Sequence, residues 1–431
     1  MGDRSGEGQT LNNLGGVLAQ QGRLEEASEH CRQALAIARE VGDRQEEGRT
    51  LTNLGNVLTQ QGRLEEAAEQ IRQALSIWRE LGDRQLEGQT LAMLAFALTL
   101  QGRFEQAADH YRQALAILPA VGDRQGQGRA LTQLAHVLAD QGRLEEAADH
   151  HRQAVGIWRE LGDRRFEGES LNNLGSVLAD QGRFGQAADQ FRQALGIFRE
   201  VGDRHSEGQT LTNLGSVLAE QGQFGQAADS YRQALAILPE VGDRQRQGQT
   251  LTNLGRVLAD QGRFEEAADQ FRRALAIWRE VGDGQGQSET LAHLGGALVE
   301  QGQFGQAADH YRQALAIARE VGDRYGEGQT LNNLGRILAK QSRFEEAADH
   351  YLQALSIARE VGDHRAEAAT LANIGTARAE QGNADQAGES WRAALAIYEQ
   401  RGAPEAQQLR QKLQQLDRQP RRSWPFGRRR G

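Results

Sequence analysis

The chain has 431 residues, a formal net charge of −9 and one cysteine, Cys31. A single cysteine excludes an intramolecular disulfide and a metal site with several cysteine ligands. No long apolar run exists, and the N-terminal MGDRSGEGQT lacks the apolar segment of a signal peptide. We therefore expect a soluble, cytoplasmic protein.

Charge is distributed unevenly along the chain. Residues 418–431 carry six arginines and no acidic residue, which leaves 44 basic and 59 acidic residues, a net charge of −15, in residues 1–417. Proteins bind nucleic acid largely by neutralising its phosphates with basic side chains. We therefore expect no nucleic-acid ligand for the acidic part of the chain and favour a protein or peptide partner.

Residues 1–400 consist of ten consecutive repeats of 40 residues, without insertion or deletion, and each repeat closes on a version of Arg-Glu-Val-Gly-Asp-Arg. A strict period of this length is typical of solenoids, in which every repeat buries its apolar face against its neighbours. One elongated array is therefore expected instead of the two or three globular domains that the length alone suggests.

Each repeat contains the pattern of two helices, as the fifth repeat illustrates. Leu171, Leu174 and Leu178 recur at three- and four-residue spacing, which predicts an amphipathic helix that ends at Gly182. Asp203 suits the N-cap of the next repeat. The loops are only a few residues long, so neighbouring helices are expected to be antiparallel. The second helix is expected to bury Ala187, Phe191, Ala194, Leu195 and Ile197.

Leu171-x2-Leu174-Gly175-x2-Leu178 followed by Ala187-x3-Phe191 resembles the tetratricopeptide-repeat pattern, with leucine in place of its usual Trp and Tyr. The resemblance covers residues 1–400, and the 40-residue repeat is similar to those of kinesin light chains, Pins-type spindle adaptors and bacterial signalling proteins. The resemblance implies an all-α fold, an α-solenoid forming a right-handed superhelix of about ten helix-turn-helix repeats, with a concave groove that binds peptides.

The end of the chain departs from the repeat pattern. Residues 401–417 are predicted to form a C-terminal capping helix, because Leu409, Leu413 and Leu416 lie at amphipathic spacing. The basic segment 418–431 is predicted to be a disordered tail. Its alternative roles are attachment to an anionic membrane or nucleic acid, or contact with an acidic surface of the same or another copy.

A polar stripe lies opposite the buried stripe of each first helix, at about 100° per residue. If the first helices line the concave surface, as the resemblance implies, an asparagine recurs along the groove. Its carboxamide donates and accepts hydrogen bonds, so a ladder of such groups suits the backbone of an extended peptide. The alternative is that recent duplication copied one harmless asparagine. The predicted ladder comprises Asn13, Asn53, Asn173, Asn213, Asn253, Asn333 and Asn373.

The third repeat replaces this polar stripe with Leu86, Met93, Phe96 and Leu100. A contiguous exposed apolar patch usually marks an interaction site, so we predict an anchor pocket for a ligand here. The alternative is cover by another part of the chain. Farther along the array, Arg256 and Arg336 are predicted to place positive charge in the groove.

No residue constellation supports catalysis or binding of a cofactor or metal. Equivalent histidines in stacked repeats, such as His110 and His150, are expected to lie two helix spacings of ~8–10 Å apart, far too distant to share a metal. We interpret the chain as a non-catalytic interaction scaffold that binds an extended peptide segment of a partner. The alternatives are a structural protein that self-assembles into a homo-oligomer, and a ligand-sensing module that controls a partner enzyme.

Overall fold

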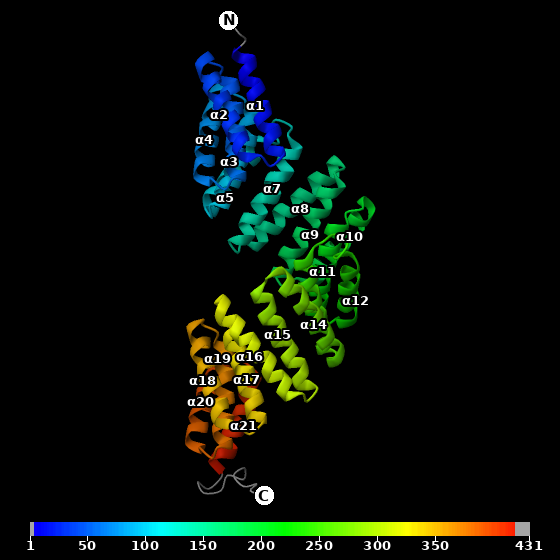
Figure 1. Ribbon diagram of the computed structural model, residues 1–431, viewed down its shortest axis with the longest axis vertical. Coiled ribbons are helices and arrows are strands. Elements are labelled where there is room, and N and C mark those ends of the chain that lie inside the picture. The colour runs from blue at the N-terminus through cyan, green and yellow to red at the C-terminus, as the bar shows by residue number, and fades with distance from the viewer. Residues whose placement is uncertain (1–3, 419–431) are drawn as a thin grey trace. The chain divides into compact units, whose positions relative to one another are not determined.

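The computed structural model describes residues 4–418, which form 21 α-helices and no β-strand (Figure 1). The all-α fold predicted from the repeat pattern is therefore confirmed. The chain divides into two compact units, Met1–Gln221 and Gly222–Gly431. The predicted basic tail lies outside the described residues beyond Arg418.

Odd-numbered labels up to α19 mark the first helix of a 40-residue repeat, and even-numbered labels mark the second helix. The first compact unit contains α1 (Arg4–Gln20), α2 (Leu24–Val41), α3 (Arg44–Gln60), α4 (Leu64–Leu81), α5 (Arg84–Leu100), α6 (Phe104–Ile117), α7 (Arg124–Asp140), α8 (Leu144–Leu161), α9 (Arg164–Asp180), α10 (Phe184–Val201) and α11 (Arg204–Glu220). The second contains α12 (Phe224–Ile237), α13 (Arg244–Asp260), α14 (Phe264–Val281), α15 (Gly284–Glu300), α16 (Phe304–Val321), α17 (Arg324–Lys340), α18 (Phe344–Glu360), α19 (His364–Glu380), α20 (Ala384–Gln400) and α21 (Glu405–Arg418).

Glycine and aspartate set the ends of the helices. Gly202 follows α10 with φ of 73°, a left-handed conformation that costs glycine little. The Asp203 side chain then accepts a hydrogen bond of 3.0 Å from the Ser206 backbone N–H, which caps α11. Gly182, which follows α9, has φ of 72°. The helix ends predicted at Gly182 and Asp203 are confirmed.

Small residues let the two helices of a repeat approach closely. A Cβ atom added at Gly175 of α9 would lie 2.7 Å from the ring of Phe191, which is 1% exposed on α10. First helices of neighbouring repeats also touch, as α1 and α3 do in one compact unit and α13 and α15 in the other. Cys31 is fully buried in the slot that Phe191 fills in its own repeat, and burial raises the pKa of its thiol to about 11.

A buried carboxylate joins most consecutive repeats, and we call the residue that bears it the junction glutamate. Glu47 at the start of α3 is 8% exposed and accepts hydrogen bonds from Arg39 Nε at 2.9 Å and Arg44 NH1 at 2.6 Å. Burial raises the pKa of Glu47, but the two arginines outweigh this effect and hold it below its usual value. The same pair of arginine contacts surrounds Glu87, Glu167, Glu207 and Glu327.

The junction glutamate is replaced in the two repeats that follow a proline. Pro119 and Pro239 stand where other second helices carry the first arginine. In the repeats that follow, the residue is glutamine: Gln127 accepts a hydrogen bond from Arg124 at 2.7 Å, and Gln247 accepts one from Arg244 at 2.8 Å. A carboxamide carries no charge, so it tolerates burial with fewer cationic partners than a carboxylate does.

The last helix, α21, packs against α20 in the second compact unit. Leu409 is 4% exposed and, with the partly buried Leu413 and Leu416, joins the apolar cluster around Trp391. Lys412 lies 5.5 Å from the centroid of the Trp391 ring, within the range of a cation–π contact. This helix therefore covers apolar surface of the tenth repeat.

The glycines on α9 and α10 are predicted to respond in opposite ways to substitution. Gly175→Val forces a branched side chain against Phe191 and should lower the free energy of unfolding by about 1–3 kcal/mol. Gly196 is exposed within α10 and an added Cβ would have no atom within 4 Å, so Gly196→Ala should raise it by about 1 kcal/mol. Urea denaturation measures both changes; equal effects would contradict the close approach at Gly175.

Fully buried His151 should make stability depend on pH. Neither ring nitrogen has a hydrogen-bond partner among the described residues, and burial, aided by His136 and His150, lowers its pKa to about 3. The unfolded chain takes up this proton near pH 6.5, so stability falls as the pH drops from 6.5 toward 3, by up to about 2 kcal/mol at pH 5. His151→Phe should remove this loss in urea denaturation at pH 7.5 and 5.0, whereas the exposed His205→Gln should retain it. An unchanged pH dependence in His151→Phe would contradict the assignment.

Candidate functional site

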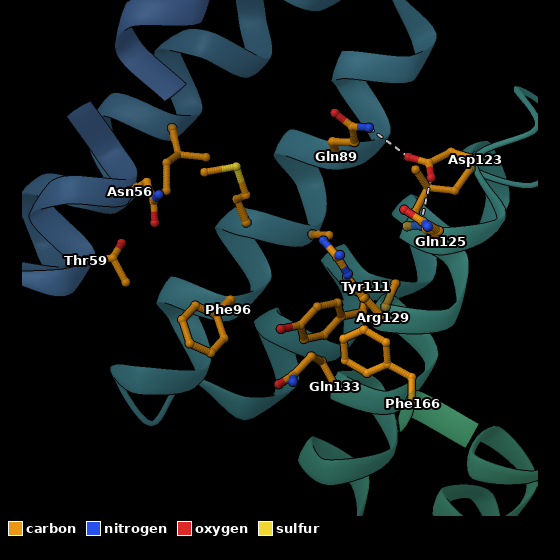
Figure 2. Close-up of a pocket in the computed structure, with 16 residues that line it drawn as sticks. Asn56, Thr59, Gln89, Phe96, Tyr111, Asp123, Gln125, Arg129, Gln133 and Phe166 are labelled. Atoms are coloured by element: carbon orange, nitrogen blue, oxygen red, sulfur yellow. Dashed lines mark hydrogen bonds between the residues drawn. The ribbon is translucent and has the colours of Figure 1, made fainter. Parts of the chain in front are cut away.

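A hollow with a volume of about 620 Å³ lies in the first compact unit (Figure 2). Its wall is built mainly from the first helices of four consecutive repeats, α3, α5, α7 and α9. We call it the Phe96 hollow. Its volume is in the range of sites that hold small ligands or the anchoring side chains of a partner. Its lining includes Asn56, Gln89, Met93, Phe96, Tyr111, Asp123, Arg129, Gln133 and Phe166.

One side of the Phe96 hollow is apolar and aromatic. Met93 and Phe96, both predicted from the third repeat, line it from α5, and Phe96 is 43% exposed. Tyr111 is 1% exposed, and in Figure 2 its hydroxyl points to the Phe96 side of the hollow. Burial raises the pKa of Tyr111, and a contact with Thr99 cancels part of this increase. Thr99 nevertheless donates its own proton to the Ala95 carbonyl at 3.0 Å, and the Tyr111 hydroxyl lacks a partner with hydrogen-bond geometry among the described residues.

The other side of the hollow carries one occupied carboxylate and one unpaired guanidinium. Asp123 accepts from the Gly126 backbone N–H at 2.7 Å and from Gln89 Nε2 at 2.8 Å, so both of its oxygens are engaged. The Arg129 guanidinium lies 5.9 Å from the centroid of the Phe166 ring, and no carboxylate of the described part of the chain pairs with it. The hollow therefore presents a cation beside aromatic surface.

A second hollow of about 350 Å³, which we call the Asn53 hollow, lies nearby against α1, α3 and α5. Leu86 lines this hollow and packs against the cluster that contains Trp78, so it is separate from Met93 and Phe96. Leu100 is 50% exposed and lines neither hollow. The structure thus divides the four predicted apolar residues between two hollows and open surface. Other lining residues of the Asn53 hollow are Asn12, Asn13, Glu46, Arg49 and Asn53.

In the second compact unit, a small hollow of about 50 Å³ is lined by Asn333 and Arg336 of α17, among others. The Arg336 guanidinium approaches the side-chain oxygen of Asn333 at 3.5 Å, and Lys340 lines the same hollow. Arg256 is exposed on α13 and does not line this hollow. This hollow therefore carries two cationic side chains and one carboxylate, that of Glu300, and the placing of Arg336 in a groove stays a prediction.

The recurring asparagines are less exposed than a solvated face requires. Asn13 is exposed, whereas the other six are half-buried. Three of them donate to an asparagine of the preceding repeat: Asn53 to Asn12 at 2.9 Å, Asn213 to Asn172 at 3.4 Å and Asn373 to Asn332 at 3.0 Å. Asn173 and Asn253 line none of the three hollows above. Sequence reasoning missed these bridges, although the doubled asparagine of LNNLG marks each acceptor.

Sequence reasoning also missed much of the Phe96 hollow. Phe166 could have been found, because it is aromatic where the corresponding residue of most repeats is small or polar, such as Gly126 or Ser206. Tyr111 and Asp123 could not have been found, because the position of Tyr111 serves the core and that of Asp123 caps a helix from the second to the tenth repeat. Their contribution depends on how consecutive repeats stack, which no single repeat reveals.

Within residues 4–418, no group of three or more histidine, cysteine, aspartate or glutamate side chains is arranged to hold a metal ion. No helix in that part of the chain combines the length and the apolar character needed to cross a bilayer. The surface features of the site are thus hydrogen-bonding amides, aromatic rings and a few charges.

Three solved structures show the fold at low sequence identity. One is a signal transduction ATPase with numerous domains from Pyrococcus horikoshii, which has a tetratricopeptide repeat sensor. Its TM-score is 0.63 at 14% sequence identity, and the match covers 86% of this chain and 55% of that chain. The apo form of the quorum sensor NprR from B. thuringiensis has a TM-score of 0.55 at 14% sequence identity, and the match covers 82% of this chain and 97% of that chain. Aspartyl phosphate phosphatase F from Bacillus subtilis has a TM-score of 0.52 at 15% sequence identity, and the match covers 83% of this chain and 94% of that chain.

No curated protein matches the sequence. The family model of the tetratricopeptide repeat, in contrast, matches residues 7–80, 46–120, 126–200, 169–240, 246–320 and 326–400. These matches cover most of the chain and coincide with the helix pairs and their glycine–aspartate junctions. The chain belongs to the tetratricopeptide-repeat family.

Proposed function

We propose that this protein is a non-catalytic interaction scaffold that binds an extended peptide segment of a partner along its first helices. The Phe96 hollow supports the proposal most strongly. Its wall, built from four repeats, combines an exposed aromatic side chain with a buried hydroxyl that has no hydrogen-bond partner and a guanidinium that has no acidic partner among residues 4–418. Such a combination of apolar wall and few polar groups suits the anchor side chain of a partner.

The spacing of the repeats supports an extended ligand. First helices of neighbouring repeats touch, so their equivalent residues lie about one helix spacing, or roughly 8–10 Å, apart. An extended chain covers that distance with about three residues, at ~3.3 Å per residue. The ladder asparagines would then meet the peptide backbone once in each such interval, while the hollows between them select side chains.

A sensory role is the second candidate. The Pyrococcus horikoshii protein carries a tetratricopeptide repeat sensor and NprR is a quorum sensor, and both share this fold. The Phe96 hollow has the volume for a small ligand as well as for a peptide side chain. Cytoplasmic location, self-association and contact of the basic tail with an acidic surface remain predictions from the sequence.

Selection from a random-peptide display library tests the scaffold proposal. Wild type should enrich a peptide family, and Phe96→Ala should weaken its binding about 30-fold, since truncating an anchor contact costs about 2 kcal/mol. Leu100→Ala is the matched control, because Leu100 is exposed on the same helix outside the hollow.

The ladder is tested in the same selection with Asn173, Asn213 and Asn253 changed together to alanine. Weaker binding of the whole peptide family, regardless of side chains, is expected if these amides hold the backbone. Absence of any enriched peptide on the wild type would overturn the scaffold proposal. Equal binding by Phe96→Ala and Leu100→Ala would overturn the anchor assignment alone.

A further inference from the structure

Asn53 sits at the end of a short chain of hydrogen bonds that begins at a buried carboxylate. Glu46 is 6% exposed, and one of its oxygens accepts from Asn12 Nδ2 at 2.8 Å and from the Thr50 hydroxyl at 3.4 Å. Asn12 is 4% exposed, and its Oδ1 accepts from Asn53 Nδ2 at 2.9 Å. All of these residues except Thr50 line the Asn53 hollow.

The chemistry of the carboxylate fixes the direction of the whole chain. A carboxylate only accepts hydrogen bonds, so Asn12 must turn its NH₂ group toward Glu46. Its oxygen is then left for Asn53, which must use its own NH₂ group for that contact. Asn53 therefore keeps its side-chain oxygen, an acceptor, for the hollow. The other two asparagine bridges lack such a carboxylate, because Ser206 and Ala366 stand at the position of Glu46.

Donors without partners flank this acceptor. The indole N–H of Trp78, which is 1% exposed, has no hydrogen-bond partner among the described residues, whereas the equivalent Trp278 donates to Thr252 at 3.4 Å. Arg49 lines the hollow, and no acidic side chain of residues 4–418 pairs with it. The hollow thus offers a directed acceptor beside the exposed Arg49 guanidinium, with the indole N–H of Trp78 buried in its wall. A peptide unit, with one N–H and one carbonyl, matches this set.

We propose that the Asn53 hollow binds a backbone N–H of the bound segment through the Asn53 side-chain oxygen, and that Glu46 and Asn12 are positioning residues that keep this oxygen outward. This inference rests on the proposed function, since it names how one part of the groove holds a peptide. It makes Asn53 a selective hydrogen-bond acceptor, whereas the other ladder asparagines are free to present either the oxygen or the NH₂ group of the amide.

A small probe tests the acceptor without any knowledge of the partner. Protein labelled with ¹⁵N at asparagine side chains is titrated with N-methylacetamide, which has an N–H, and with N,N-dimethylacetamide, which has none. The Asn53 signals should shift at least threefold more with the first probe. In Glu46→Gln, whose amide both donates and accepts, this preference should disappear. Asn373, bridged without a carboxylate, is the internal control and should show no preference.

Two results would overturn the inference: equal shifts of Asn53 with both probes, or a preference that survives in Glu46→Gln. Thermal unfolding of each variant guards against a general loss of structure. If Glu46→Gln fails to fold, Asn12→Leu replaces it, since this change also frees the Asn53 amide to turn. The surviving variant must show the same loss of preference.

A peptide from the display selection separates this inference from the proposed function. Methylating its backbone nitrogens one at a time should weaken wild-type binding about tenfold at one position, and the effect should vanish in Asn53→Leu. An enriched peptide with no such position leaves the scaffold intact and refutes the Asn53 acceptor. If no peptide is enriched, the scaffold proposal fails, and the amide probes still decide whether Asn53 is a directed acceptor.

Discussion

The buried junction glutamate is the polar interaction that recurs where most consecutive repeats stack. It lies at the start of a first helix, and one of its arginines comes from the second helix before it while the other follows in its own helix, as Arg39 and Arg44 do around Glu47. Both carboxylate oxygens are engaged, so the charge is compensated although the side chain is buried. The arginine side chains remain about half exposed, so they contact both the solvent and the buried carboxylate. Each such contact joins the end of one helix pair to the start of the next.

The candidate binding surface follows from that regular stacking. Because consecutive first helices meet side by side, residues 40 positions apart in the sequence come together on one surface, and small changes in single repeats produce local sites. The Phe96 hollow arises where the third, fourth and fifth repeats introduce Phe96, Arg129 and Phe166. The Asn53 hollow arises where Glu46 replaces the small residue of most other repeats. A uniform scaffold thus carries sites of different chemistry.

The sequence predicted the helices and their ends because these features recur from repeat to repeat and depend on local contacts. It also placed Met93 and Phe96 at a hollow. It failed where the outcome depends on two repeats at once: Leu86 packs near Trp78 rather than beside Phe96, and Asn53, Asn213 and Asn373 bond to asparagines 41 residues earlier. Helical periodicity gives the face of a residue, but not the neighbour that covers it.

The replacement of the junction glutamate by glutamine after Pro119 and Pro239 also constrains how such an array can evolve. Nearly identical repeats invite recombination that deletes or reorders them, and most repeats would stack on one another equally well. A repeat that ends in proline is an exception. Placed before the repeat that contains Glu167, it would leave that carboxylate with Arg164 alone, buried and only half compensated. The order of the repeats is therefore part of the inherited information, although their sequences look interchangeable.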